Sequence, residues 1–248
     1  MEREREVGPA PVETGVGGRA LDAVLVGPTI YEGPTAFIDI DRLVRTLEGD
    51  ALTGHVRVEG PGFTGLVLLV AGRVVAARFS DGRMGGIRAI GDALRCLEWR
   101  AQRGDGRVTV VGLDSDRAEA ATELLTGLAL VGGLRGRFAD LDALLEYLGE
   151  VSVDGTMVVE AGERSAAVLL TAGRVRRTFV AERSVAGRVP VAVRTLAADP
   201  AARISVAADP HWAPGRPPAR VPALVLQGRR AARTRRRSAQ TATGGGVA

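Results

Sequence analysis

The stretch FIDIDRLVRTLEGDALTGHVRVEG at residues 37–60 returns as FADLDALLEYLGEVSVDGTMVVEA at residues 138–161. The match continues without a gap to residues 74 and 175, always at an offset of 101, and 15 of the 38 paired positions are identical. Farther along, the offset falls to 96, where Arg107 pairs with Arg203. Solenoid repeats have periods of only ~20–50 residues. The spacing therefore indicates a duplicated small domain.

The order of elements within one copy follows from hydrophobic spacing. Apolar residues recur at i, i+3, i+4 and i+7 from Ile40, which is the spacing of one helix face. Alternation predicts a strand at 55–59, and an apolar run predicts a central strand at 65–70. Gly72 suits a tight hairpin turn, and a second helix is expected to end near Trp99. We expect an α+β fold with two tandem duplicated small domains (helix, three strands, helix, strand) joined by a bridging helix.

Composition shifts divide the chain into five parts. Gly and Pro recur through the first residues, and the last residues are rich in Pro and Arg. We expect a flexible leader at 1–34, a first repeat at 35–112, a bridging helix at 113–134, a second, diverged repeat at 135–209 and a disordered tail at 210–248.

Acidic residues at the predicted helix starts are interpreted as caps. Asp39 and its counterpart Asp140 directly precede the leucine-rich helices, where a carboxylate accepts hydrogen bonds from free backbone N–H groups. Asp116, with Glu119 three residues later, resembles a capping box at the start of the bridging helix. These carboxylates are therefore not expected to be catalytic.

Composition excludes several kinds of site. Cys96 is the only cysteine, so a disulfide scaffold is excluded. A structural zinc site needs about four Cys or His ligands, and the chain has only Cys96, His55 and His211. No lysine is present, so a phosphate-binding P-loop is excluded too. We expect no catalytic residues, no metal and no cofactor. We interpret His55 as a polar residue at a strand edge and Cys96 as a buried or half-buried residue.

Charge is distributed unevenly along the chain. Residues 211–248 carry eight arginines and no acidic residue, which leaves 25 arginines and 29 acidic residues in residues 1–210. Such a basic tail attracts phosphates in a salt-sensitive, sequence-independent way, and it has no interleaved aromatic residues for base stacking. The candidate nucleic-acid- or anion-binding residues are Arg229, Arg230, Arg233, Arg235, Arg236 and Arg237.

Small and apolar residues at characteristic positions resemble the PATAN domain of bacterial signalling proteins. The resemblance covers 37–111, and a diverged form covers 138–207, where Gly155, Gly173 and Gly187 are kept. It implies an interaction module of two-component or motility signalling without established catalytic activity. The matching residues of the first copy are Thr53, Gly54, Gly72, Val74, Ala77, Gly91, Ala93, Leu94, Trp99, Gly106 and Val108.

The sequence suggests three alternative functions. The first is a non-enzymatic bacterial signalling adaptor or scaffold that binds a protein partner, such as a two-component or small-GTPase signalling component. The second is a nucleic-acid-associated protein that uses the arginine-rich tail. The third is a nucleotide-sensing module, suggested by Arg176, Arg177, Arg183 and Arg188. No apolar run approaches the ~20 residues of a membrane span, and the first residues do not resemble a secretory signal. We therefore expect a cytoplasmic protein.

Overall fold

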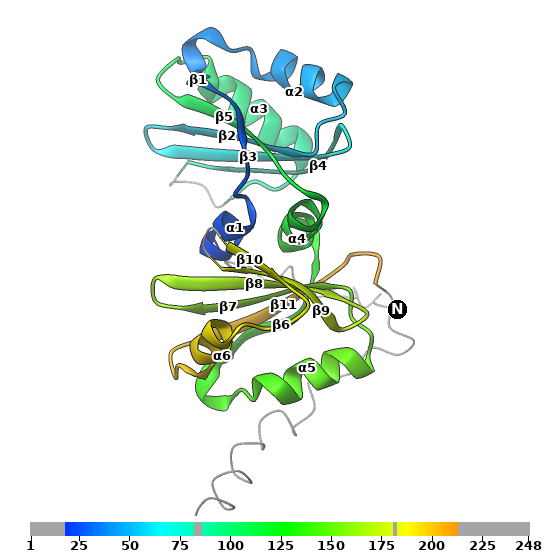
Figure 1. Ribbon diagram of the computed structural model, residues 1–248. Helices are drawn as coiled ribbons and strands as arrows, with labels where there is room; N and C mark the ends of the chain where they lie inside the picture. The colour runs from blue at the N-terminus through cyan, green and yellow to red at the C-terminus, as the bar shows by residue number, and fades with distance from the viewer. Residues whose placement is uncertain (1–17, 82–85, 181–182, 213–248) are drawn as a thin grey trace, which may run out of the picture. The chain divides into compact units, whose positions relative to one another are not determined.

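A five-stranded antiparallel sheet forms the centre of the first of two units in the computed structural model, which describes residues 18–81, 86–180 and 183–212 (Figure 1). The first unit consists mainly of residues 21–127, and its strand order is β1-β5-β2-β3-β4. The first half of the chain contains, in order, α1 (Gly18–Val24), β1 (Thr29–Pro34), the 3-10 helix η1 (Thr35–Phe37), α2 (Ile40–Gly49), β2 (Gly54–Gly60), β3 (Phe63–Val70), β4 (Arg73–Ser80), α3 (Ile90–Ala101), β5 (Arg107–Gly112) and α4 (Ser115–Thr126).

The second unit consists mainly of residues 128–180 and 185–212, and its sheet has the order β10-β9-β8-β7-β11-β6. Its elements are β6 (Leu128–Arg135), the 3-10 helix η2 (Gly136–Phe138), α5 (Leu141–Glu150), β7 (Gly155–Ala161), β8 (Arg164–Thr171), β9 (Arg174–Val180), β10 (Arg183–Ala186), α6 (Val191–Ala198) and β11 (Arg203–Ala208).

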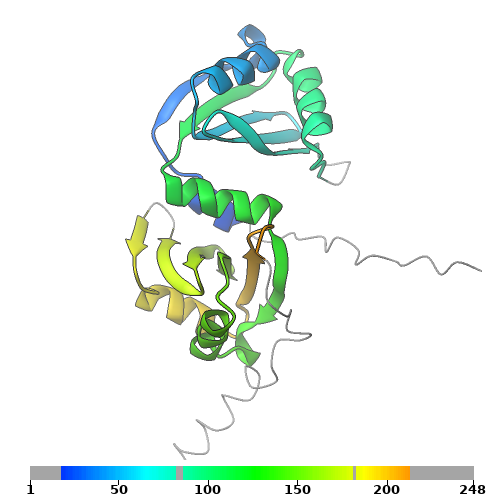
Figure 2. The ribbon, with the colours of Figure 1, turned by 90° about the vertical axis from the view of Figure 1, so that its right-hand side faces the viewer.

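Two helices cover one face of the sheet in each unit, α2 and α3 in the first and α5 and α6 in the second (Figures 1 and 2). In the first unit, Val56 and Val58 of β2 point toward these helices, because alternate residues of a strand share a face. The α2 side of this core is formed by Ile40, Val44 and Leu47, all less than a tenth exposed. Leu43, which the spacing also places on the helix face, is only partly buried.

The hairpin between β3 and β4 ends in a two-residue turn that touches the end of α2. Ala71 and Gly72 have φ of 48° and 73°, the left-handed pair typical of a type I′ turn. The Gly72 N–H donates to the Leu52 carbonyl oxygen at 2.9 Å, and the Ala71 N–H donates to Thr53 Oγ1 at 3.0 Å. A Cβ on Gly72 would overlap the carbonyl oxygen of Glu48 near the end of α2. Glycine is thus required here both by conformation and by space.

The expected α+β class is confirmed. The two sheets also share a strand order, since β1, β5, β2, β3 and β4 correspond to β6, β11, β7, β8 and β9. The bulge between Leu68 and Leu69 recurs between Leu169 and Leu170 at the same offset of 101. The sequence repeat therefore coincides with a repeat of topology, whereas gene duplication as its origin stays our interpretation.

The expected leader at 1–34 is wrong for residues 18–34. These residues form α1 and β1, and β1 pairs with β5 along the edge of the sheet, from Thr29 opposite Val111 to Pro34 opposite Arg107. An edge strand tolerates a terminal proline, because the outer side of the strand needs no hydrogen-bond donor. Residues 1–17, and residues 213–248 of the expected tail, lie outside the described part of the chain.

The expected bridging helix at 113–134 is too long. Helix α4 covers only Ser115–Thr126, and the remainder enters strand β6. Strand β6 pairs with β11 at the edge of the sheet, so a strand far along the chain satisfies the backbone groups on its inner side. The cap was also misplaced: Asp114 accepts the Arg117 N–H at 2.9 Å, while Asp116 lies within the first turn.

We predict that Gly72→Ala destabilises the protein more than Gly62→Ala does. Gly62 has a similar φ of 76° but open space around its Cα, so its substitution carries only the backbone cost of about 1 kcal/mol. Overlap with the end of α2 should add about 2 kcal/mol for Gly72→Ala. Urea unfolding of both variants measures the difference, and equal losses would show that the turn does not press on the helix.

Candidate functional site

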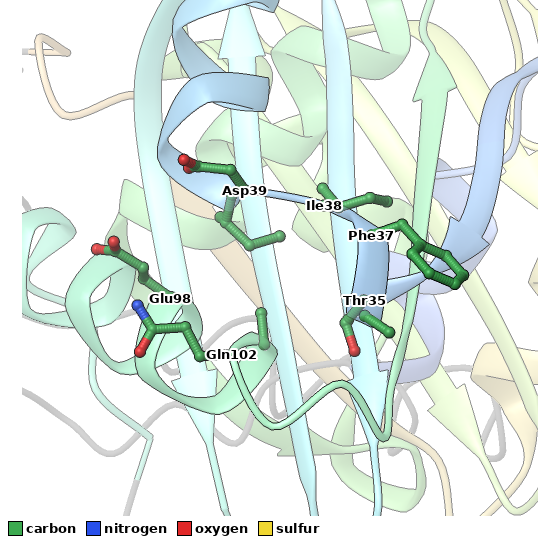
Figure 3. A pocket seen from close by; sticks show the side chains of 9 residues that line it. Thr35, Phe37, Ile38, Asp39, Glu98 and Gln102 are labelled. Carbon is green, nitrogen blue, oxygen red and sulfur yellow. The ribbon is translucent and has the colours of Figure 1, made fainter.

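A pocket of about 400 Å³ opens in the first unit where α2 begins (Figure 3). One wall is the junction of η1 and α2, and the other is the last turn and a half of α3. Its lining mixes apolar and polar side chains, namely Thr35, Ala36, Phe37, Ile38, Asp39, Ile40, Glu98, Ala101 and Gln102.

Thr35 holds the first wall in place. Its side chain is only 2 % exposed, and its Oγ1 accepts the Gly106 N–H at 2.9 Å. The Thr35 N–H in turn donates to the Gly106 carbonyl oxygen at 2.9 Å. These two hydrogen bonds to the loop before β5 fix the short 3-10 turn. Phe37, at the end of that turn, is 87 % exposed, and in Figure 3 its ring points away from Glu98 and Gln102.

Two carboxylates give the pocket a negative charge. Asp39 caps α2, and its Oδ1 accepts the Arg42 N–H at 2.9 Å. Glu98 of α3 is half-buried and makes no ion pair or side-chain hydrogen bond within the described residues. Carboxylate oxygens beside Ile38 and Ala101 can accept hydrogen bonds from a cation while the apolar surface contacts its carbon chain.

The second unit has a smaller pocket, of about 220 Å³, at the corresponding position where α5 begins. Asp140 caps α5 there and accepts the N–H groups of Asp142 and Ala143 at 3.1 Å each. Arg194 of α6 makes an ion pair with Asp142 across this pocket. At the offset of 96, Arg194 corresponds to Glu98, so the two pockets carry opposite charges at one equivalent position.

An exposed phenylalanine stands beside each pocket. Phe138 corresponds to Phe37 at the offset of 101 and is 50 % exposed. The guanidinium of Arg137 lies 4.5 Å from the centre of the Phe138 ring, within the range of a cation–π contact. Trp99, next to Glu98 on α3, is 57 % exposed, and the Arg103 guanidinium lies 4.5 Å from its ring centre.

The six candidate arginines, Arg229 to Arg237, lie outside the described residues. Of the four arginines behind the nucleotide-sensing alternative, Arg176 and Arg177 are consecutive residues of β9 and so point to opposite faces of the sheet. The backbone of Arg188 lies near that of Arg176, because the N–H of the preceding residue, Gly187, donates to the Arg176 carbonyl oxygen at 2.9 Å. The side chain of Arg183 is not described. The structure thus does not place all four arginines in one site.

Sequence reasoning missed Glu98 as a site residue. Asp39 was interpreted as a cap only, and its side chain confirms that role. A signal for the pocket does exist in the repeat: phenylalanine precedes the capping aspartate in both copies, and the charge reverses between Glu98 and Arg194. Periodicity does not reveal that these positions lie together.

His55 is buried rather than at a polar strand edge. It lies on β2 between Leu68 and Val111 of the neighbouring strands, is 3 % exposed, and its Nδ1 has no hydrogen-bond partner. Burial of the imidazole is the main cause that lowers the pKa of His55 to about 4; the Arg57 guanidinium contributes in the same direction, and Asp22 partly opposes both. Its ring is therefore neutral at pH 7. Cys96 of α3 is half-buried against the core.

No model of a known protein family matches the chain, and no curated protein matches it. Within the described residues, no three His, Cys, Asp or Glu side chains are grouped so that they could hold a metal ion. The helices of that part of the chain are too short or too polar for any of them to span a membrane.

We predict that His55 makes the protein less stable in mild acid. In the unfolded chain His55 takes up a proton near pH 6.5, whereas in the folded chain it does so only near pH 4. The contribution of neutral His55 to the free energy of unfolding is therefore full above pH 6.5 and is lost as the pH falls toward 4. The full loss from this group is about 3 kcal/mol.

Urea unfolding of the wild type and of His55→Thr, the residue found at the equivalent position 156, between pH 7 and pH 4 measures this contribution. The variant should lose less stability over that interval, while His211→Gln, at an exposed histidine, should behave as the wild type does. Parallel curves for the wild type and His55→Thr would contradict the prediction.

Proposed function

We propose that the chain is a non-enzymatic bacterial signalling adaptor that binds a partner protein, with the pocket at the start of α2 as the main contact surface. The observation that carries this proposal is the exposure of Phe37, 87 % open to solvent at the rim of a pocket. A ring exposed beside a pocket offers apolar area that a partner can bury, and aromatic residues are enriched among the residues that dominate binding energy.

Repetition of the feature supports the proposal. Phe37 and Phe138 are two of only five phenylalanines in a chain with 4 % aromatic residues, yet neither contributes to a core. Each is the last residue of a 3-10 turn and lies two residues before a capping aspartate. A rigid scaffold that presents the same ring twice is typical of an interaction module.

The resemblance to PATAN domains supports a signalling role in the bacterial cytoplasm, with a two-component or small-GTPase signalling component as the partner. The residues of that resemblance include turn and core positions, such as Gly72 and Ala93. The resemblance thus concerns the scaffold, and the pocket side chains carry the choice of partner.

We predict that Phe37→Ser weakens partner binding by about thirtyfold, the effect of a dominant interface residue. The partner would be captured from the native host with the full-length chain, identified, purified and titrated by calorimetry. Ile30→Ser is the matched control, because Ile30 is also exposed, at 55 %, but lies on β1 outside the pocket lining. Unchanged affinity for Phe37→Ser, with Ile30→Ser equally neutral, would rule out this surface.

A second function is favoured by the charge distribution. The eight arginines of residues 211–248, without an acidic residue, suit phosphate binding on a nucleic acid. We predict that duplex DNA binds with a log–log salt slope near −4 to −5, as expected for about five phosphate contacts, and with little dependence on base sequence. Replacing the six arginines between Arg229 and Arg237 with serine should abolish this binding, and sequence-specific binding would contradict it.

A further inference from the structure

Arg194 shows how a guanidinium fits against the start of a helix in this fold. It extends from α6 to Asp142 in the first turn of α5, and the two side chains form an ion pair across the pocket of the second unit. Arg194 and Asp142 are 46 % and 69 % exposed, so the pair is screened by solvent. Its position is informative, because it shows that a guanidinium from α6 reaches the first turn of α5.

The first unit lacks this guanidinium. Glu98 takes the place of Arg194, and Asp41, the counterpart of Asp142, pairs with Arg45 of its own helix at 2.7 Å. Asp39 and Glu98 line a pocket of about 400 Å³, compared with about 220 Å³ in the second unit. Within the described residues, neither carboxylate has a cationic partner. The larger pocket therefore has carboxylate acceptors without the cation that the smaller one contains.

We propose that the pocket of the first unit binds an arginine from the segment ALVLQGRRAARTRRR, residues 223–237 of this same chain. The segment lies outside the described residues and is considered through its sequence alone. It joins four apolar residues to six arginines and contains no acidic residue. The flat guanidinium donates up to five hydrogen bonds, and it suits a pocket with two carboxylates better than a compact ammonium does.

Charge and surface both match this occupant. Residues 1–210 have a net charge of −4, and residues 211–248 carry eight arginines. The apolar residues at 223–226 can pack against the exposed ring of Phe37 and the side chain of Ile38, which line the same pocket as the two carboxylates. The proposal shares the pocket with the proposed adaptor function but does not require a partner protein.

The test uses a fluorescently labelled peptide of residues 223–237. It is titrated, at about 0.1 M salt, into the full-length chain in which the six arginines are replaced with serine. We expect saturable binding, weakened about tenfold by Glu98→Arg, which places in the first unit the residue that the second unit has. Glu48→Arg is the matched control: it causes the same change of charge at an exposed residue of α2 outside the pocket lining, and it should leave binding nearly unchanged.

Two further arms identify the occupant. A peptide with lysine in place of all six arginines should bind more weakly than the arginine peptide. The wild-type chain, whose own arginines compete, should take up less labelled peptide than the serine-substituted chain. Equal losses in Glu98→Arg and Glu48→Arg, or equal uptake by the wild-type and serine-substituted chains, would overturn the proposal. Neither result bears on the Phe37→Ser measurement, so the adaptor function stands or falls separately.

Discussion

The contact between the β3–β4 turn and the end of α2 determines how each unit is assembled. Gly72 lies so close to the end of the helix that a Cβ there would overlap the Glu48 carbonyl oxygen and the Ala51 Cα, so no side chain fits. The turn is held by two hydrogen bonds to the loop that follows α2. Gly173 stands in the same relation to α5. Helix and hairpin are thereby joined at one end, so the apolar face of the helix has only one way to lie on the sheet.

Once the end of α2 is fixed, the position of its beginning follows, because a helix of ten residues is a rigid rod of about 15 Å. The beginning is anchored separately by the hydrogen bonds between Thr35 and Gly106. Helix α3 packs beside α2 on the same sheet face, and Glu98 of α3 therefore lines the same pocket as the capping residue Asp39. The pocket is thus a consequence of helix packing, and its character depends on the few side chains at its rim.

The two units show how a single change of charge alters such a pocket. Asp39 and Asp140 have the same capping role, and Phe37 and Phe138 the same exposed position. Glu98 and Arg194 differ in sign, and only the arginine can pair with the carboxylates at the helix start. One scaffold therefore presents a pocket with an internal cation in one unit and a pocket with two carboxylates and no internal cation in the other.

Local patterns in the sequence determined the α+β class, the caps at Asp39 and Asp140, and the glycine of each hairpin turn, because each depends on neighbouring residues alone. Strands β1 and β6 escaped prediction, because their pairing partners lie far along the chain and their own sequences contain Gly or Pro. Only the tertiary structure placed Glu98 and Asp39 in one pocket, and only it buried His55 and thereby lowered the pKa of that histidine. Proximity and burial arise when distant segments pack together, and no local period records which segments those will be.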